Sequence, residues 1–328
     1  MGIARMAAAG LALTIGLAAQ AGAKELRLSH QFAVGDLRHK VAEMIAQDVA
    51  AADVDLSIRI FPASSLFKAN DQYMPLSRGQ LDMTLLPLSY AGGQQPVYNL
   101  TLFPGLIKSH EHARRVNDSE FMQELETVLN DDDITTLARG YLAGGFASVD
   151  GCVTHPDDVK GRTVRAAGKG FEEMLAAAGA SIASMPSSEN YNAMQQKILQ
   201  ALNTSSSSFV SFRLYEIVDC YTPATDEALW FMYQPVLINK TTFDDLTPEQ
   251  QQALRDASAR AEDWYAEEAA KEDAASVEVF RNAGVEIAEM TEEDRQAWLD
   301  LAQESSFAIF AREVPDGQRW LDLATSVE

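Results

Sequence analysis

The chain has 328 residues, of which 47% are hydrophobic and 23% charged, and its formal net charge is −22. This composition is typical of a globular protein and excludes a disordered or low-complexity chain. Such an acidic surface repels nucleic acid and anionic lipid, so neither is an expected partner. The length exceeds what one small core usually organises, so we expect two lobes.

Residues 1–23 have the features of an export signal. A single charged residue, Arg5, precedes an apolar run, and small residues at positions 21–23 suit a cleavage site. The apolar run is shorter than the roughly 20 residues that a membrane span needs. We therefore predict cleavage after Ala23, export through the inner membrane and a soluble, periplasmic mature protein.

Strand and helix patterns alternate after the signal. Apolar residues recur with a period of two in 25–29 and 54–60, and with a helical period in 37–49. A short helix is expected around 70–77, and a further strand at 81–86. This alternation predicts an α/β lobe whose parallel sheet is covered by helices.

A second α/β series begins near residue 144. Its expected strands are 147–153, 163–166 and 181–185, with a helix at 171–178 and another that begins at Ser187 or Ser188. A polar serine run follows. The apolar segment 229–238 is then expected to cross back to the first lobe.

A long helix is predicted over residues 248–282. It begins at the capping box Thr247-Pro248-Glu249-Gln250, and no helix-breaking residue occurs before Gly284. About 35 residues give a length of roughly 50 Å at 1.5 Å per residue, which is longer than one lobe is wide. The helix should therefore brace both lobes. Another start signal, at Thr291, predicts a C-terminal helix.

One segment carries a candidate anion site. Residues 157–165, Asp-Asp-Val-Lys-Gly-Arg-Thr-Val-Arg, place Arg165 at the far end of a short strand. A glycine-bracketed turn at 168–170 and a helix beginning at Phe171 follow. A fixed guanidinium beside the free N–H groups of a helix N-terminus is a common way to bind a carboxylate. The alternative is a surface arginine paired with Asp157 or Asp158.

The same tract resembles the middle of solute receptors from tripartite ATP-independent periplasmic (TRAP) transporters, the DctP-type solute-binding proteins. The shared features are a proline/aspartate turn, Lys-Gly, a two-residue spacer and Val-Arg. Other segments resemble the same family in order and spacing along nearly all of the mature chain. They are 25–30, 61–66, 78–83, 192–199 and 243–250.

The resemblance implies a two-lobed periplasmic-binding-protein architecture with a long interdomain helix and a ligand cleft that closes by hinge motion. Lobe I is expected to contain 24–143 and 231–270, and lobe II 144–230 and 271–328. The implied role is capture of an organic acid and its delivery to the small and large TRAP membrane subunits, driven by an ion gradient. Neither catalysis, a cofactor nor a resident metal is expected.

The resemblance also implies site residues. Arg165 matches the arginine that holds the substrate carboxylate, and Asn203 falls where many members place a polar cleft residue. The serine run that follows, including Ser207, is either part of the cleft or a flexible linker. A second cation, common in the family near Gly145 or Phe146, is lacking here. This departure argues against a ligand with several carboxylates.

Four aromatic residues are candidates for the ligand pocket: Tyr90, Phe146, Phe171 and Trp230. Tyr90 is favoured because it lies just past the third strand, and ligands of open α/β sheets bind outside such carboxyl ends. Each of the others could instead belong to the core. If they line the cleft, the ligand is a monocarboxylate with an apolar or aromatic part.

Several alternatives stay open at this level. An exported hydrolase acting on a small acidic substrate would need a nucleophile and base, paired carboxylates or a metal cluster, and the sequence shows no Gly-x-Ser-x-Gly motif. Cys152 and Cys220 could form a disulfide or be buried separately. Arg213 is expected to pair with Glu216. A monomer is expected, with a dimer through the long helix as the alternative, and a metal ion accompanying the ligand is neither indicated nor excluded.

Overall fold

The computed structural model describes residues 24–224 and 228–327, so the predicted signal peptide lies outside the described residues. Over these two ranges, no helix is both long and apolar enough to cross a membrane.

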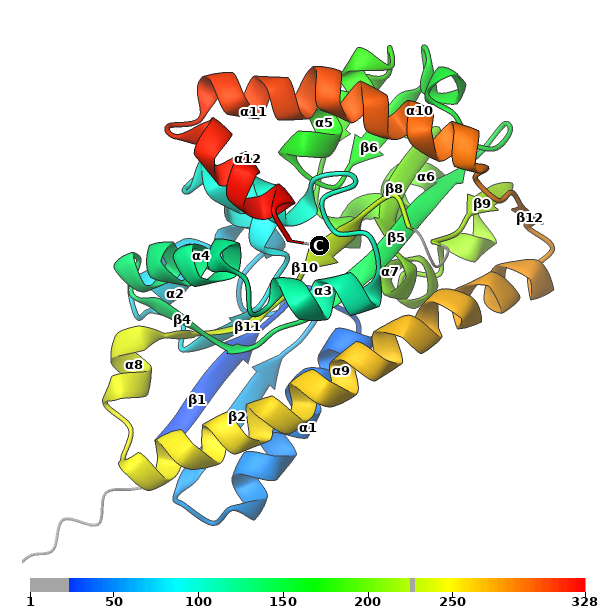
Figure 1. Ribbon diagram of the computed structural model, residues 1–328. Helices are drawn as coiled ribbons and strands as arrows, with labels where there is room; N and C mark the ends of the chain where they lie inside the picture. The colour runs from blue at the N-terminus through cyan, green and yellow to red at the C-terminus, as the bar shows by residue number, and fades with distance from the viewer. Residues whose placement is uncertain (1–23, 225–227, 328) are drawn as a thin grey trace, which may run out of the picture.

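The first sheet has five strands in the order β2-β1-β3-β11-β4 (Figure 1). Its strands are β1 (Lys24–Ser29), β2 (Leu56–Phe61), β3 (Met83–Leu85), β4 (Ile134–Ala138) and β11 (Val236–Asn239). β1 pairs in parallel with β2 and β3, whereas β11 runs antiparallel to β3 and β4. The helix predicted at 37–49 is α1 (Leu37–Ala51), which packs on β2 and buries its apolar face.

The second sheet has the order β12-β9-β5-β8-β6-β7, and β10 pairs with β5. Its strands are β5 (Tyr141–Ser148), β6 (Thr163–Ala166), β7 (Ser181–Ser184), β8 (Ala201–Ser205), β9 (Cys220–Thr222), β10 (Phe231–Tyr233) and β12 (Glu286–Ile287). The expected strand at 147–153 was misplaced, because β5 begins at Tyr141. All eight residues of β5 are buried, so the strand shows no alternation of apolar and polar residues.

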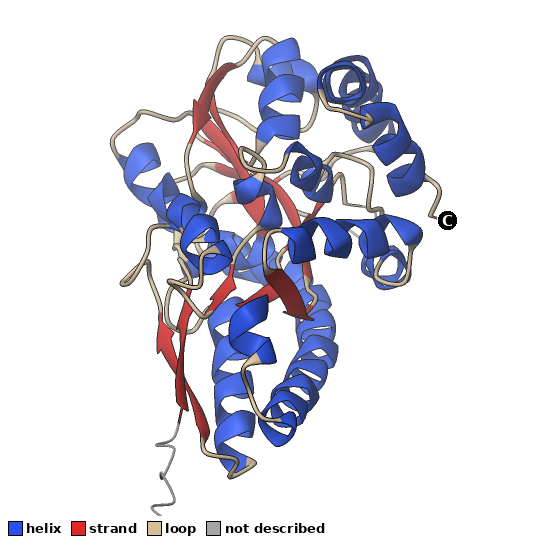
Figure 2. Cartoon of the chain, turned by 90° about the vertical axis from the view of Figure 1, so that its left-hand side faces the viewer, coloured by secondary structure: helices blue, strands red, loops and turns tan. Residues whose placement is uncertain are grey.

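Helices cover both sheets (Figure 2). Besides α1 and α9, the α-helices are α2 (Tyr73–Ser77), α3 (His110–Val116), α4 (Glu120–Asp131), α5 (Lys169–Ala177), α6 (Asn190–Gln195), α7 (Ser206–Ser211), α8 (Lys240–Asp244), α10 (Glu292–Ala302), α11 (Ala308–Glu313) and α12 (Gly317–Thr325). Short 3-10 turns are η1 (Ala69–Asp71), η2 (Leu88–Ala91), η3 (Pro96–Leu102), η4 (Pro156–Val159), η5 (Ser187–Glu189) and η6 (Leu214–Glu216), and η7 (Gln303–Phe307) is a π-helical turn. The serine run is not a flexible linker, because Ser205 caps α7 and the run is buried.

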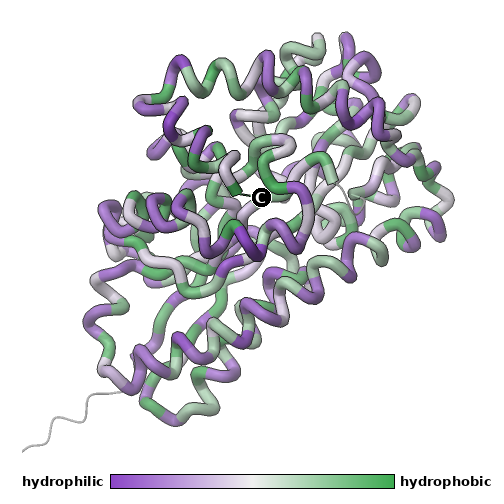
Figure 3. The backbone as a smooth tube through the Cα atoms, viewed as in Figure 1, coloured by the Kyte–Doolittle hydropathy of each residue, from purple (hydrophilic) through white to green (hydrophobic). Residues whose placement is uncertain are grey.

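The long helix α9 (Pro248–Asn282) begins at the predicted capping box and has the predicted length of 35 residues. It packs against α1 and β4 beside the first sheet, and against α7, β5 and β12 beside the second (Figure 1). Hydrophilic and hydrophobic residues alternate along it (Figure 3), because one face contacts the two sheets and the other faces solvent. α9 is therefore the brace that the sequence predicted.

The chain crosses between the two sheets twice before α9, once from β4 to β5 and once from β10 to β11. At these crossings the backbone nitrogen of Gln234 donates to the carbonyl oxygen of Gly140 at 2.7 Å. A Cβ atom on Gly140 would overlap the ring of Tyr265 from α9, so only glycine fits there. Because β10 pairs with β5, the return to lobe I at residue 231 was predicted too early. With the return moved to Gln234, the division into lobes stays a proposal.

Cys152 and Cys220 form a disulfide, with their Cα atoms 5.2 Å apart. The bond joins the turn after β5 to the start of β9, and the two cysteines are 68 residues apart in sequence. It therefore decides between the two states that the sequence left open.

Candidate ligand-binding site

Arg165 lies near the carboxyl end of β6, where it pairs with Ala183 of β7 and Leu202 of β8. Its side chain is completely buried. Nε donates to the carbonyl of Met185 at 3.0 Å, Nη1 to the carbonyl of Asn203 at 2.6 Å, and Nη2 to the hydroxyl of Tyr90 at 3.1 Å. These bonds use three of the five N–H donors of the guanidinium and fix its plane.

Arg165 has no carboxylate partner among the described residues. Asp158, its alternative partner, instead accepts from the backbone of Thr154 and His155, where it completes a cap. Burial lowers the pKa of Arg165, and only the hydroxyl of Tyr90 and the more distant Glu172 oppose this effect. An uncompensated buried cation costs several kcal/mol. A bound anion would remove that cost.

Tyr90 lies beside Arg165. It comes from η2, which follows β3 of the first sheet, and its hydroxyl also accepts from the backbone nitrogen of Ser187 in η5, at 3.1 Å. Burial raises the pKa of Tyr90, but the charge of Arg165 and hydrogen bonds from Ser187 outweigh burial, so the pKa is lowered. One phenol oxygen thus links the two halves of the molecule at the cation.

Two carboxamides that the sequence reasoning missed lie at this junction. Gln31 follows β1 directly, and Asn190 is the first residue of α6, three residues after Ser187. Gln31 is 2% exposed and Asn190 0%, and none of their side-chain nitrogen and oxygen atoms has a hydrogen-bond partner. Leaving a buried polar group unpaired costs about 1–3 kcal/mol. Gln31 could have been found by the rule that nominated Tyr90, because it too follows the carboxyl end of a strand.

A pair of histidines fixes the loop that carries Gln31. Nδ1 of His30 accepts from the backbone nitrogen of Phe32 at 3.1 Å, so the proton of neutral His30 is on Nε2. That nitrogen lies 3.1 Å from Nδ1 of His39, whose Nε2 lies 3.2 Å from the carboxylate of Glu43. Burial and the neighbouring His39 lower the pKa of His30 to about 3. His30 is therefore neutral at physiological pH.

Asn203 reaches Arg165 through its carbonyl and not through its carboxamide. In the sheet, Leu202 is paired with Arg165, whereas Asn203 is paired with Phe146 of β5. Because side chains alternate along a strand, the carboxamide of Asn203 lies on the other face of the sheet from Arg165. It is buried there without a hydrogen-bond partner.

Among the described residues, the guanidinium of Arg165 forms no hydrogen bond with the remaining predicted side chains. The hydroxyl of Ser207 bonds the carboxylate of Glu272 on α9. Phe171 packs edge-on against Trp230, with ring centroids 5.4 Å apart, and all three predicted aromatics other than Tyr90 belong to one hydrophobic core. This packing favours the core alternative for them, and a role in ligand binding stays a prediction.

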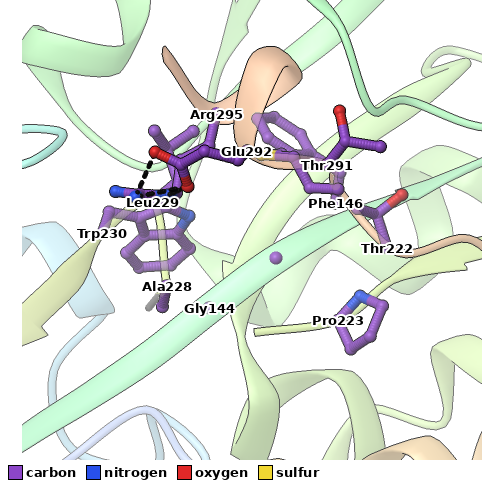
Figure 4. A pocket seen from close by; sticks show the side chains of 12 residues that line it. Gly144, Phe146, Thr222, Pro223, Ala228, Leu229, Trp230, Thr291, Glu292 and Arg295 are labelled. Atoms are coloured by element: carbon purple, nitrogen blue, oxygen red, sulfur yellow. Dashed lines mark hydrogen bonds and ion pairs between the residues drawn. The ribbon is translucent and has the colours of Figure 1, made fainter. Parts of the chain in front are cut away.

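Phe146 and Trp230 also line a separate cavity of about 290 Å³ in the second half of the molecule (Figure 4). Phe146 stacks on Trp298 of α10 with ring centroids 5.4 Å apart. Glu292 and Arg295, from the first turns of α10, form an ion pair beside this cavity. None of the residues that contact the guanidinium of Arg165 lines it.

A larger cavity, of about 590 Å³, is lined by Tyr90 and Met185, which both bond Arg165, and by Ala166, the residue after Arg165 in β6. Its walls come from η2 and η3 beside the first sheet, from β6 and α5 of the second, and from α11. The N-terminus of α5, which the sequence placed beside Arg165, opens into this cavity through Gly168 and Lys169. The ionisable lining groups other than Tyr90 are Lys169, Glu172, Glu173 and Glu313.

The protein has two β-sheets covered by helices, connected by two chain crossings and by the long helix α9. A buried arginine with no carboxylate partner among the described residues lies at their junction. These features are those of a two-lobed solute-binding protein. The model of bacterial extracellular solute-binding protein family 7, named DctP, matches residues 28–313. The chain therefore belongs to this family, the DctP-type receptors of TRAP transporters, and the predicted resemblance is confirmed.

Individual relatives agree with this assignment. A solute-binding protein of Albidiferax ferrireducens is 35% identical over 288 residues, which cover 86% of this chain and 85% of the relative. The 2,3-diketo-L-gulonate-binding periplasmic protein YiaO of Escherichia coli is 28% identical over 304 residues, covering 90% and 89%. The crystal structure of a TRAP periplasmic solute-binding protein from Rhodoferax ferrireducens with bound malonate is 34% identical, with a TM-score of 0.89 and coverage of 92% of this chain and 98% of that chain.

Proposed function

We propose that this protein is an extracytoplasmic receptor that binds an organic acid through Arg165 and delivers it to the small and large membrane subunits of a TRAP transporter. The observation that carries the proposal is a fully buried guanidinium with no carboxylate partner among the described residues. An arginine of this kind can donate to both oxygens of a carboxylate, a geometry that lysine cannot reproduce. The malonate-bound relative and the diketogulonate-binding relative support an acid as the ligand.

We propose further that the ligand carries one carboxylate. Arg213, a candidate second cation, is exposed and paired with Glu216, as expected from the sequence. The other buried arginine, Arg38, is already bound to Asp36. An apolar or aromatic part of the ligand gains no support from Phe146, Phe171 and Trp230, which pack together in one hydrophobic core.

The receptor acts in the periplasm, as a monomer, after removal of the signal peptide behind Ala23. It acts by binding alone and needs no cofactor. The exported-hydrolase alternative finds no support in the relatives, whose names describe binding proteins. Analysis of the acid by mass spectrometry after prolonged incubation tests this point, since a receptor returns its ligand unchanged.

Calorimetric titration of the mature chain with a panel of organic acids tests the proposal. Arg165→Ala should cost roughly 2–5 kcal/mol of binding free energy, because the ligand anion loses a buried charged partner. Arg165→Lys should also bind poorly. Arg162→Ala is the matched control, since Arg162 lies on the same segment but bonds the backbone carbonyls of Asp150 and Gly151. A folded Arg165→Ala variant with wild-type affinity for the acids would refute the assignment.

A further inference from the structure

We infer that the ligand is a hydroxylated monocarboxylic acid whose hydroxyl groups bond Gln31 and Asn190. The inference rests on the proposed function, because Arg165 supplies the site for the carboxylate. It assigns to two side chains a role in choosing among acids.

Gln31 and Asn190 are buried with both ends of the carboxamide unpaired, which among the described residues is shared by Asn203 alone. Asn239, which is also buried, donates to the carbonyl of Leu76 and accepts from the backbone nitrogen of Thr242. Gln250 likewise bonds through both its amide nitrogen and its oxygen. Gln31 and Asn190 bond through neither. Their hydrogen-bonding groups are therefore available to a molecule that enters the site.

Gln31 and Asn190 come from segments next to those that carry Tyr90 or bond its hydroxyl. Gln31 follows the carboxyl end of β1 and Tyr90 follows that of β3, and these strands pair in parallel, so both residues lie at the same edge of the first sheet. Asn190 begins the helix that follows η5, and the backbone of η5 donates to the hydroxyl of Tyr90 through Ser187. Asn190 follows Ser187 by three residues in one helical stretch, so the two residues lie on the same side of it, on the half of the molecule opposite to that of Gln31. Asn203, which is also unpaired, is left out because it lies on the other face of its strand.

Hydroxyl groups of a ligand match the hydrogen-bonding capacity of the two carboxamides. A carboxamide offers two donors and an acceptor, and a hydroxyl group both donates and accepts, so one hydroxyl can satisfy either end of the amide. A second carboxylate only accepts, and would leave the amide oxygens unpaired. An alkyl chain would satisfy none of these groups. Hydroxyl groups on the ligand are therefore the best complement to Gln31 and Asn190.

The charge and size of the cavity lined by Tyr90 and Met185 also favour a hydroxy acid. The cavity, of about 590 Å³, has room for a chain of several carbons past the carboxylate. Its ionisable lining, apart from Tyr90, comprises one lysine and three glutamates, a net charge of −2. This lining repels a second anionic group and accepts hydrogen bonds from hydroxyls. Dicarboxylates are therefore disfavoured relative to hydroxy acids.

Calorimetric titration of the mature chain with matched acids tests the inference. D-Gluconate and hexanoate have the same carbon number and one carboxylate each, and succinate and malonate carry two carboxylates. We expect gluconate to bind at least 10-fold more tightly than the other three. Gln31→Met and Asn190→Leu, which keep side-chain volume but remove the amide, should each weaken gluconate binding about 10-fold and change hexanoate binding less than 2-fold. Gln195→Met, an exposed carboxamide on α6, is the control and should change neither.

The ratio of gluconate to hexanoate affinity is measured within each variant, so partial unfolding of a variant does not alter it. The inference is overturned if wild-type protein binds hexanoate or a dicarboxylate as tightly as gluconate, or if neither variant changes the ratio. In that case Arg165→Ala still abolishes binding of whichever acid is preferred, and the proposed function stands. If Arg165→Ala leaves every affinity unchanged, or if the wild-type chain binds none of the four acids, the inference and the function behind it both fail.

Discussion

Arg38 holds the carboxylate of Asp36 in a two-pronged ion pair, with Nε 2.7 Å from Oδ1 and Nη2 2.6 Å from Oδ2, and both side chains are buried. The guanidinium also donates to Ser208 of α7 at 2.9 Å and to Gln234 at the crossing between the sheets at 3.1 Å. Burial opposes ionisation of Asp36, but the attraction of Arg38 and its hydrogen bonds lower the pKa of the carboxyl. Two arginines are therefore buried among the described residues: Arg38, which is paired with Asp36, and Arg165, for which we propose a ligand as the partner.

Removing the carboxylate of this pair should be more damaging than removing both charges. Asp36→Asn should lower the free energy of unfolding by about 3–5 kcal/mol, because it leaves a buried guanidinium uncompensated. The double variant Asp36→Leu/Arg38→Met should lose less than Asp36→Asn alone. Urea denaturation followed by circular dichroism measures both, and equal losses in the two proteins would contradict this account of the pair.

Tyr90→Phe should weaken the contact between the two halves in the ligand-free protein. The substitution removes an acceptor shared by a charged donor and a backbone N–H, and hydrogen bonds to charged groups contribute about 1.5–3 kcal/mol. We expect the variant to populate more open molecules, seen as a larger radius of gyration in small-angle X-ray scattering. Tyr215→Phe, at a partly exposed position, is the control. Scattering curves that coincide for wild type and Tyr90→Phe would count against the role of this contact.

The free energy of unfolding should decrease as the pH is lowered, because of His30. Its folded pKa, about 3, lies below the value of about 6.5 expected when unfolded, so between these values the unfolded chain binds a proton that the folded protein excludes. Stability from this group is complete above pH 6.5 and is lost by up to about 1.4 kcal/mol per unit as pH decreases toward 3. His30→Asn should show a shallower loss between pH 6.5 and 5 in urea denaturation. His155→Asn, at a partly exposed histidine, is the control. If the free energy of unfolding of wild type and of His30→Asn changed in parallel with pH, His30 would not be the group responsible.

Breaking the disulfide should destabilise the second half of the molecule. A bond that closes a loop of this length contributes about 2–4 kcal/mol, chiefly by restricting the unfolded chain. Cys152→Ala/Cys220→Ala should therefore melt at a lower temperature than oxidised wild type in calorimetry. Dithiothreitol should lower the melting temperature of wild type and leave that of the double variant unchanged. A reductant effect of the same size on both proteins would show that the bond is not its target.

The features that the sequence predicted well have local causes. The capping box at Thr247 and the lack of any breaker before Gly284 were sufficient to define α9. Arg165 was found because a strand, a glycine turn and a helix follow one another without insertion, and Tyr90 because it follows a strand that ends at the junction. Whether these residues bind a ligand stays a prediction until the binding measurements are made.

The features that the sequence did not predict depend on packing between distant segments. Nothing near Phe146 indicates which face of β5 a helix will cover, and the Gly144–Gly145 pair hides the strand in an otherwise uniform apolar run. Gln31 and Asn190 were not singled out, because a polar residue after a strand or at the start of a helix does not by itself indicate that it is buried. Ser207 was predicted as part of the cleft, with a flexible linker as the alternative, and nothing in the sequence indicated its partner Glu272 on α9.

The adjacent crossings at Gly140 and Gln234 pack against Tyr265 of α9. They would restrict the directions in which the two halves of the proposed receptor can move apart. Three stretches of chain connect the halves, namely the two crossings and α9. A hinge motion of the kind expected for this family would therefore turn the halves about one axis near the crossings. Sliding and free rotation would tear the hydrogen bond between Gln234 and Gly140. A hinge motion that kept this bond would open the cleft on the side away from the crossings and would bend α9.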